Sequence, residues 1–414
     1  MANTFKVIDM VTKEALRLAH EKATFIGTVD RQYDESFKDS GKGKQGATLR
    51  VREPNKYTRR QGSRIMDVQD QAESTQTITV ATQDGVDMRF NSAELIQSVN
   101  NGAAFDDLSK NYIEPAIASL VSGIEADFLA FATKATYQTA GTAGTAITTL
   151  LTPGAARAKL NQALAPKDRR CIQMDSVTMG ALVNGVSGYF NPSNAVAEQY
   201  REGLIARTAM ADYYENERVW TLPNSTDVTG SSDAAALVTD GGTTIDIHTL
   251  LPVATQVVGQ VFTVAGVYAC HPETKAAYPH LKQYTITAIG ATTTTISPAT
   301  ILSGAKRNCG SSTGAAIATT AFNAQVITFV GDASKSYVQP LMYHPEAFQF
   351  ITADLPIMDD AQKCVRKTQD GLSLRVWMGS DIRNDELLLR CDILYGMAAL
   401  RPEWACRLVG SANA

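Results

Sequence analysis

The chain has 414 residues, of which 44% are apolar, so it can bury a substantial core and divide into two or three domains. This composition excludes a disordered chain. Lys and Arg together number 38 and Asp and Glu number 42, so no overall positive field draws the molecule onto a polyanion. Any contact with nucleic acid is therefore expected to be local and non-specific.

The cysteines and the N-terminus indicate the cellular compartment in which the chain is made. Six cysteines have neither a CxxC pair nor a regular spacing, which argues against a disulfide framework and a zinc site. The N-terminus, MANTFKVIDMVTKEALRLAHEK, lacks the apolar run of a signal peptide, and no segment reaches the roughly 18 consecutive apolar residues of a membrane helix. We expect synthesis in a reducing cytoplasm and no membrane partner.

The first element is a predicted amphipathic helix over residues 8–24. Ile8, Val11, Ala15 and Leu18 recur at helical spacing, with charged residues on the opposite side. The polar stretch that follows, TVDRQYDESFKDSGKGKQG, cannot form a core. The helix is therefore expected to dock on another part of the protein or on a neighbour.

Residues 41–90 read as a long hairpin-like excursion, because ATLRVRE, STQTITVAT and GVDMRF alternate while the connecting residues are polar. Its first limb is basic and its second limb is acidic. The basic limb, residues 41–64, carries Lys42, Lys44, Arg50, Arg52, Lys56, Arg59, Arg60 and Arg64 against Glu53. The acidic limb, residues 67–87, carries Asp67, Asp70, Glu73, Asp84 and Asp87 and no Lys or Arg.

An isolated hairpin with few large apolar side chains is at best marginally stable in water, so a neighbour, most simply another copy of the chain, must hold it in place. Opposed charge blocks suit a repeated contact in which the basic limb of one copy meets an acidic surface of the next. The expected contact residues are Arg50, Arg52, Lys56, Arg59, Arg60, Arg64, Asp67, Asp70 and Glu73. A solvated loop without a partner and a DNA contact stay open as alternatives, and the acidic limb disfavours the second.

A long helix is predicted from Pro115 to about Tyr137, with Ile117, Val121 and Phe128 on one apolar face. Pro115 fits the first turn, where its missing N–H costs nothing, and roughly 22 residues at 1.5 Å each give a spine of about 33 Å. After a low-complexity linker, residues 139–154, the stretches AARAKLNQAL, RRCIQMD and SVTMGALVNG predict helix, strand and helix. They form an α+β layer.

Residues 224–336 are rich in Thr, Gly, Ala, Ser and Val, and contain the short β-runs VGQVFTVAGVYAC, QYTITAIG, TTTTISPA and QVITFVG. Several short strands at close spacing predict a small barrel or sandwich. The apolar α+β character resumes at Tyr343 and continues to the end of the chain. The β-module is therefore interpreted as an insertion.

Three motifs hint at chemistry. GKGKQG, residues 41–46, matches a dinucleotide-binding pattern but has no strand before it and no helix after it. GSSTG, residues 310–314, matches a nucleophile elbow, and Ser312, Asp332 and His344 follow in hydrolase order, but the flanking strand and helix are missing. The densest group of metal-ligating residue types comprises Cys270, His271, Glu273 and His280, without a helical His pair. We expect no catalytic, cofactor or metal site.

The order of elements resembles the major capsid proteins of tailed bacteriophages, which have the α+β Hong Kong 97 fold. More closely, it resembles the phage P-22-like coat protein family, which carries an inserted β-barrel. The similar stretches are GQVFTVAGVY, HPEAFQFITADLPI and DGLSLRVWMGSDIRNDELLLRCDILYGMAALRPEWACRLVG. The last contains a Tyr395-Gly396 step and an Arg401-Pro402-Glu403 turn.

The resemblance implies five parts. They are an N-terminal arm (1–40), an extended loop (41–90) lying over the neighbouring subunit, a peripheral domain with the spine helix (91–138 and 337–370), an axial domain (139–222 and 371–414), and the inserted β-domain (223–336). The Lys-Asn crosslink of some family members is not carried over, because no motif here identifies its partners.

The implied function is that of a major capsid protein with no enzymatic activity and no cofactor. Copies would form the pentamers and hexamers of an icosahedral procapsid around a scaffolding protein, with a portal protein at one vertex. The shell would expand as double-stranded DNA is packaged, with non-specific DNA contact at the inner face. The protein would be made in the bacterial host cytoplasm and end in the virion capsid. A cellular encapsulin-type compartment and a soluble hydrolase using Ser312 are the alternatives.

Overall fold

A computed structural model describes residues 23–31, 48–60, 62, 64–66, 68, 73–91, 114–186, 211–232, 236–247, 252, 255–357, 363–369, 372–410 and 412–413. Almost all of the predicted helix over residues 8–24, and the GKGKQG motif, lie outside these described residues. The fold is α+β, as predicted.

The chain forms two compact units. Unit 1 contains the described parts of Met1–Val51, Thr75–Phe128 and Phe348–Ala398. Unit 2 contains those of Arg52–Ser74, Leu129–Ala347 and Ala399–Ala414.

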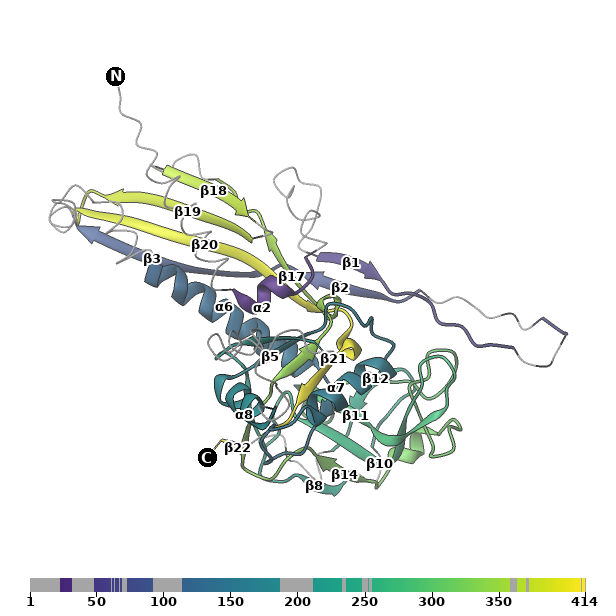
Figure 1. Ribbon diagram of the computed structural model, residues 1–414. Coiled ribbons are helices and arrows are strands. Elements are labelled where there is room, and N and C mark those ends of the chain that lie inside the picture. Colours follow the sequence, from purple (N-terminus) through teal and green to yellow (C-terminus); the bar gives the residue numbers. More distant parts are fainter. Residues whose placement is uncertain are drawn as a thin grey trace. The chain divides into compact units, whose positions relative to one another are not determined.

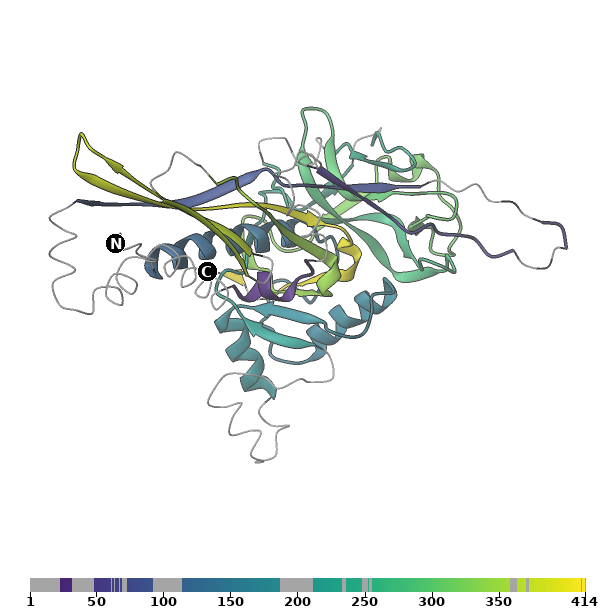
Figure 2. The ribbon, with the colours of Figure 1, turned by 90° about the horizontal axis from the view of Figure 1, so that it is seen from above.

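Unit 1 is built on a five-stranded sheet in which β17 (Phe348–Ala353), β20 (Glu386–Ala399), β19 (Leu372–Asp381) and β18 (Lys363–Gln369) follow in that order. The fifth strand, β3 (Thr82–Asn91), pairs antiparallel with β20, from Asn91 opposite Glu386 to Thr82 opposite Tyr395. Figures 1 and 2 both show β3, β19 and β20 running side by side. The core-facing residues of this sheet include Leu374, Val376, Cys391 and Ile393.

The predicted spine helix is confirmed as α6 (Glu114–Ala135), a helix of 22 residues. Pro115 lies in its first turn, and Glu114 and Lys134 stand at the ends where their charges complement the helix dipole. In unit 1 the apolar face of α6 and the facing strands line a small apolar cavity, with Ile117, Val121 and Ile124 opposite Leu374 and Ile393. By length and composition α6 could span a membrane, but half of that window is buried inside the protein, as in a core helix.

A buried carboxylate on α6 holds the short helix α2 (Thr24–Thr28) in unit 1. The N-cap residue of α2, Ala23, offers no side-chain cap. Instead, Oε1 of the fully buried Glu125 accepts hydrogen bonds from the Thr24 hydroxyl at 2.8 Å and the Phe25 N–H at 2.6 Å. Glu125 thus satisfies one of the free N–H groups that a helix leaves at its start. The Phe25 ring lies 4.8 Å from that of Phe128 and completes the attachment.

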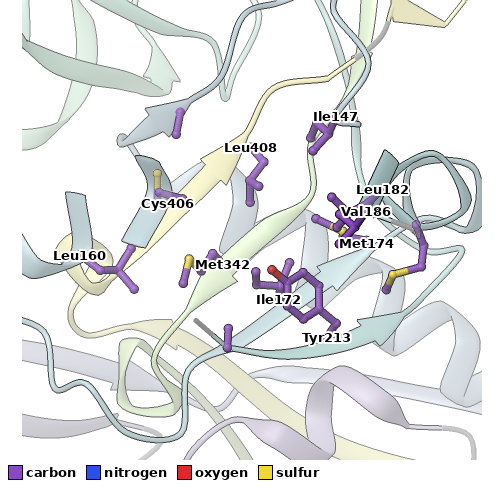
Figure 3. Close-up of a cluster of buried hydrophobic side chains, with 14 of the residues drawn as sticks. Ile147, Leu160, Ile172, Met174, Leu182, Val186, Tyr213, Met342, Cys406 and Leu408 are labelled. Atoms are coloured by element: carbon purple, nitrogen blue, oxygen red, sulfur yellow. The ribbon is translucent and has the colours of Figure 1, made fainter. Parts of the chain in front are cut away.

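Unit 2 has a second five-stranded sheet, which confirms the predicted helix, strand and helix after the linker. Its strand order is β4 (Thr139–Ala140), β21 (Ala405–Leu408), β16 (Leu341–Tyr343), β5 (Cys171–Met174) and β6 (Asp212–Glu215). Helices α7 (Leu151–Gln162) and α8 (Ser176–Val186) pack on it. Figure 3 shows the resulting core, where Ile172, Met342 and Leu408 from the sheet meet Leu160 of α7 and Leu182 of α8.

The predicted β-module forms a seven-stranded sheet with its own core. The order is β8 (Thr229–Ser231), β14 (Val326–Phe329), β10 (Val261–Cys270), β11 (Ala277–Ile289), β12 (Thr294–Thr300) and β9 (Gly242–Ile245), and β13 (Cys309–Gly310) pairs with β10. Phe262, Tyr284 and Phe329 lie at the centre of its core. Among the described residues the pairings run as an open path from β8 to β9, so closure into a barrel stays a prediction.

The module is entered and left through two neighbouring strands. β7 (Thr221–Pro223) and β15 (Ser336–Val338) pair antiparallel with Pro223 opposite Ser336, in a three-stranded sheet with β22 (Ala412–Asn413). A segment whose ends are adjacent in space adds to a fold without separating the flanking elements. This pairing supports the interpretation of the module as an insertion.

The pairing of β18 with β19 bears on one predicted domain boundary. The sequence assigned residues 371–414 to the same domain as residues 139–222, but β18 and β19 form one hairpin, with Gln369 opposite Leu372. A boundary at 370 would divide that hairpin. β19 and nearly all of β20 belong to unit 1, and only the chain from Ala399 onward joins the sheet of unit 2. β3, predicted as part of the extended loop, is likewise a strand of the unit 1 sheet.

The module contains a buried lysine. Lys282 of β11 is only 9% exposed, and its Nζ stands 4.9 Å from the centroid of the Tyr137 ring. Burial lowers the pKa of Lys282 from 10.5 to about 8. At neutral pH the charged form of Lys282 is therefore present in a site that disfavours it, which lowers the stability of the fold.

We expect Lys282→Met to stabilise unit 2 by about 2 kcal/mol at pH 7. Between pH 8 and 10.5 the unfolded chain keeps a proton on Lys282 that the folded chain has released, so the stability of the unmodified protein rises with pH there. The advantage of the variant should therefore shrink over this window. Urea unfolding from pH 7 to 10 measures the difference in the free energy of unfolding between Lys282→Met and the unmodified protein, with Lys167→Met as an exposed control. A difference that stays constant with pH would contradict this prediction.

Candidate assembly interface

The described part of the extended loop confirms the predicted hairpin at its base. β1 (Thr48–Arg52) and β2 (Thr75–Thr79) pair in a two-stranded sheet, shown side by side in Figure 1. Just beyond it, the Glu53 N–H donates to the Ser74 carbonyl at 2.9 Å, and the Ser74 hydroxyl donates to Glu53 Oε2 at 2.6 Å. Lys306 of the module donates to the Ser74 hydroxyl oxygen at 2.8 Å within unit 2.

An exposed ion pair joins the described parts of the two charged limbs. Arg52 Nε lies 3.7 Å from Glu73 Oε2, and the two side chains are 77% and 62% exposed. An ion pair this exposed contributes little to stability. The guanidinium of Arg60 also donates to the Ile65 carbonyl.

Most of the predicted contact residues face solvent. Those that the structure describes as exposed are Arg50, Arg52, Lys56, Arg59, Arg60, Arg64 and Glu73. The remaining two, Asp67 and Asp70, lie outside the described residues. The basic limb therefore presents its charges outward, where a surface of opposite sign can meet them.

The loop also exposes apolar side chains that the sequence reading overlooked. Ile65, Met66 and Val68 are each about four-fifths exposed, at 80%, 79% and 78%, and Tyr57 is 56% exposed. The run RIMDV inside a polar loop was the available signal. Apolar and aromatic side chains beside arginines are the composition of the centre of a protein interface. This loop thus carries both the charges and the apolar surface that a protein contact requires.

The residues of the hydrolase hypothesis are not assembled into a site. Asp332 binds Lys335 at 3.1 Å and Tyr337 at 3.2 Å. His344 is buried against Trp404, and its Nδ1 accepts the Glu346 N–H. Neither residue contacts the exposed Ser312, so no proton relay links the three.

The residues of the metal hypothesis take part in local packing. His271 Nδ1 accepts the N–H groups of Glu273 and Thr274, and the His280 ring stacks on Tyr278. Cys270 is buried, and among the described residues no three His, Cys, Asp or Glu side chains gather as metal ligands would. Burial and nearby cations lower the pKa of His280 to about 4, so it is neutral at physiological pH.

The comparison with protein families finds a match to the C-terminal part of the chain. The sequence pattern of the family described as "P22 coat protein - gene protein 5" matches residues 232–410. Over these residues the chain is similar to that coat protein family. The match begins in the inserted module, covers less than half of the chain, and includes the Tyr395-Gly396 step and the Arg401-Pro402-Glu403 turn.

The comparison with solved structures finds matches from phages and from a virus-like particle, all at low sequence identity. A structure described as Mycobacterium phage Che8 has a TM-score of 0.48 and 11% identity, covering 93% of this chain and 90% of that one. The capsid of Ralstonia phage GP4 has a TM-score of 0.46 and 8% identity, covering 89% and 85%. A virus-like particle from Pyrococcus furiosus has a TM-score of 0.39 and 8% identity, covering 97% and 98%. The likeness to the coat protein family rests on the sequence match, and no curated protein matches the chain.

Proposed function

We propose that this chain is a phage coat protein, the major capsid protein of a tailed double-stranded DNA phage, and that its copies form the pentamers and hexamers of an icosahedral procapsid. The family match over residues 232–410 carries this proposal. The alternative of a cellular encapsulin-type compartment receives no support from that match. Purified shells should contain DNA and no cargo enzyme.

The extended loop is the proposed contact between copies. Its described residues expose cations and apolar side chains together, while Arg52–Glu73 is a weak internal ion pair. Such a surface gains free energy only when a neighbour covers the apolar groups and faces the charges. Arg50, Arg52, Lys56, Arg59, Arg60, Arg64 and Glu73, together with Asp67 and Asp70, are the proposed contact residues.

The other partners follow from the capsid role. A scaffolding protein would guide the procapsid, a portal protein would occupy one vertex, and packaged DNA would touch the inner face without sequence specificity. A net charge of -4 on the chain suits a wall that encloses DNA without adhering to it. Synthesis and assembly would take place in the host cytoplasm.

Reversing the charge of Arg59, Arg60 and Arg64 to Glu should leave the monomer folded and block shell formation. Placing three acidic side chains against an acidic surface costs several kcal/mol per contact, repeated at every copy of the interface. Electron microscopy of the expressed variant, under conditions in which the unmodified chain forms shells, measures the effect.

The matched control replaces the same three arginines by Lys, which keeps the charge and changes the hydrogen-bonding geometry. That variant should still assemble, with a lower yield at most. Normal particles from the Glu variant would contradict the contact, and so would loss of particles accompanied by an unfolded monomer in circular dichroism.

A further inference from the structure

The second limb of the loop approaches β20 closely at its base, where β2 ends and β3 begins. We propose that the Tyr395-Gly396 step is a clamp that fixes this base in unit 1, so that the loop enters each contact between copies with its base already ordered. The proposal rests on the assembly role proposed for the loop. It assigns a physical task to a step that the sequence identified only by resemblance.

Gly396 provides the first contact. A Cβ atom at this position would lie 2.2 Å from the Thr79 carbonyl oxygen and 3.0 Å from Val80 Cα. Both neighbours are backbone atoms at the end of β2, so they cannot turn aside as a side chain can. The chain between β2 and β3 therefore rests directly on β20, and only glycine permits this approach.

Tyr395 provides the second contact. Its hydroxyl donates to Asp84 Oδ2 of β3 at 2.7 Å, and its ring, 1% exposed, stacks on Phe350 with centroids 5.5 Å apart. Tyr395 is also the residue of β20 that stands opposite Thr82, where β3 begins. One side chain thus ties the start of β3 to the apolar core of unit 1.

A third contact lies a few residues along β3. A Cβ atom on Gly85 would stand 2.5 Å from Asp392 Oδ1 and 2.8 Å from the Cys391 carbonyl oxygen. The buried Asp392 is itself held by Arg375 at 2.6 Å. β3 is therefore pressed against β20 at both Tyr395-Gly396 and Asp392, and it cannot slide or tilt without breaking these contacts.

The clamp has a consequence for assembly. From Thr75 to Asn91 the second limb is held by strand pairing with β1 and β20, whereas Arg52–Ser74 belongs to unit 2. Fixing the base of a binding arm removes conformational freedom before association, which lowers the entropy that each contact between copies must offset.

The test compares Gly396→Ala with Gly379→Ala. Gly379 lies on β19 of the same sheet, and a Cβ atom there meets nothing within 4 Å, so it controls for replacing a strand glycine. The first measurement is hydrogen exchange on the unassembled chain. Gly396→Ala should raise the rate of amide hydrogen exchange at least tenfold over Thr75–Val80, while the amides of unit 2 stay protected. Gly379→Ala should leave the exchange rates of both regions unchanged.

The second measurement is shell formation by electron microscopy. Gly396→Ala should reduce the yield of closed shells at least tenfold, and Gly379→Ala should not. Unchanged exchange in Gly396→Ala overturns the clamp and leaves the assembly role of the loop standing. Raised exchange with a normal yield of shells overturns the part of the clamp in assembly. Normal shells from the variant in which Arg59, Arg60 and Arg64 are replaced by Glu overturn the loop contact itself.

If Gly396→Ala does not fold, Tyr395→Phe takes its place, because it removes only the hydroxyl that binds Asp84. This variant should raise exchange over Thr82–Gly85 by several fold with the core intact. Protection equal to that of the unmodified chain would overturn the proposal.

Discussion

Gly185→Ala should destabilise unit 2 by more than about 4 kcal/mol, because a Cβ atom there would stand 1.7 Å from the Thr148 carbonyl oxygen. Thr148 belongs to the linker that crosses α8, and the clash is with backbone, so the helix or the linker would have to move. Such a shift would disturb the core around Ile147 and Leu182. We expect little folded protein at 37 °C.

Gly180 on the same helix is the matched control for Gly185. A Cβ atom on Gly180 meets nothing within 4 Å, so Gly180→Ala should stabilise by up to about 1 kcal/mol through helix propensity alone. Urea unfolding of the two variants should give opposite signs. Equal effects would show that α8 does not approach the linker as closely as the structure indicates.

Asp392→Asn should destabilise unit 1 by about 3–5 kcal/mol, because it removes the countercharge of a buried arginine. Asp392 is fully buried and Arg375 is 5% exposed, and their charged atoms lie 2.6 Å apart. Asp392 also accepts a hydrogen bond from Arg390 Nε at 2.7 Å. Asparagine has nearly the same shape, so the loss would measure charge and not packing.

The double variant Arg375→Met, Asp392→Leu distinguishes a need for charge from a need for volume. Replacing a buried ion pair by apolar residues of similar size is often neutral, so this variant should recover to within about 1–2 kcal/mol of the unmodified chain. Chemical unfolding measures both proteins. A double variant as unstable as Asp392→Asn would show that the pair is required for the geometry of the sheet.

Local patterns predicted the elements of this fold because each depends on residues close in sequence. Helix α6 follows from its apolar periodicity and from Pro115, and the strands of the module follow from short β-runs between turn residues. The hairpin at the base of the loop was also visible, since alternation and polar connections define it.

The features that the sequence did not predict depend on distant partners. β20 pairs with β3, a strand about 300 residues earlier in the chain, and so belongs with β19 to the sheet of unit 1. No local pattern around residue 371 reveals this pairing. Two buried acids were nonetheless marked in the sequence, as Glu125 in VSGIEADFLAF and Asp392 in LLLRCDILYG. A lone acid inside an apolar run is often a buried group with a fixed partner.

The pairing of β3 with β20 also has a consequence for synthesis. A ribosome that has completed β3 at Asn91 must add roughly 300 further residues before β20 emerges, which takes about 15–60 s at bacterial and eukaryotic rates. During that interval β3 lacks the strand with which it pairs, while the module, whose last strand ends at Phe329, has all of its strands earlier. The sheet of unit 1 is therefore completed only by β20, and that of unit 2 only by β21, so both sheets lack a strand until the end of synthesis and chaperones would have strand edges to shield until then.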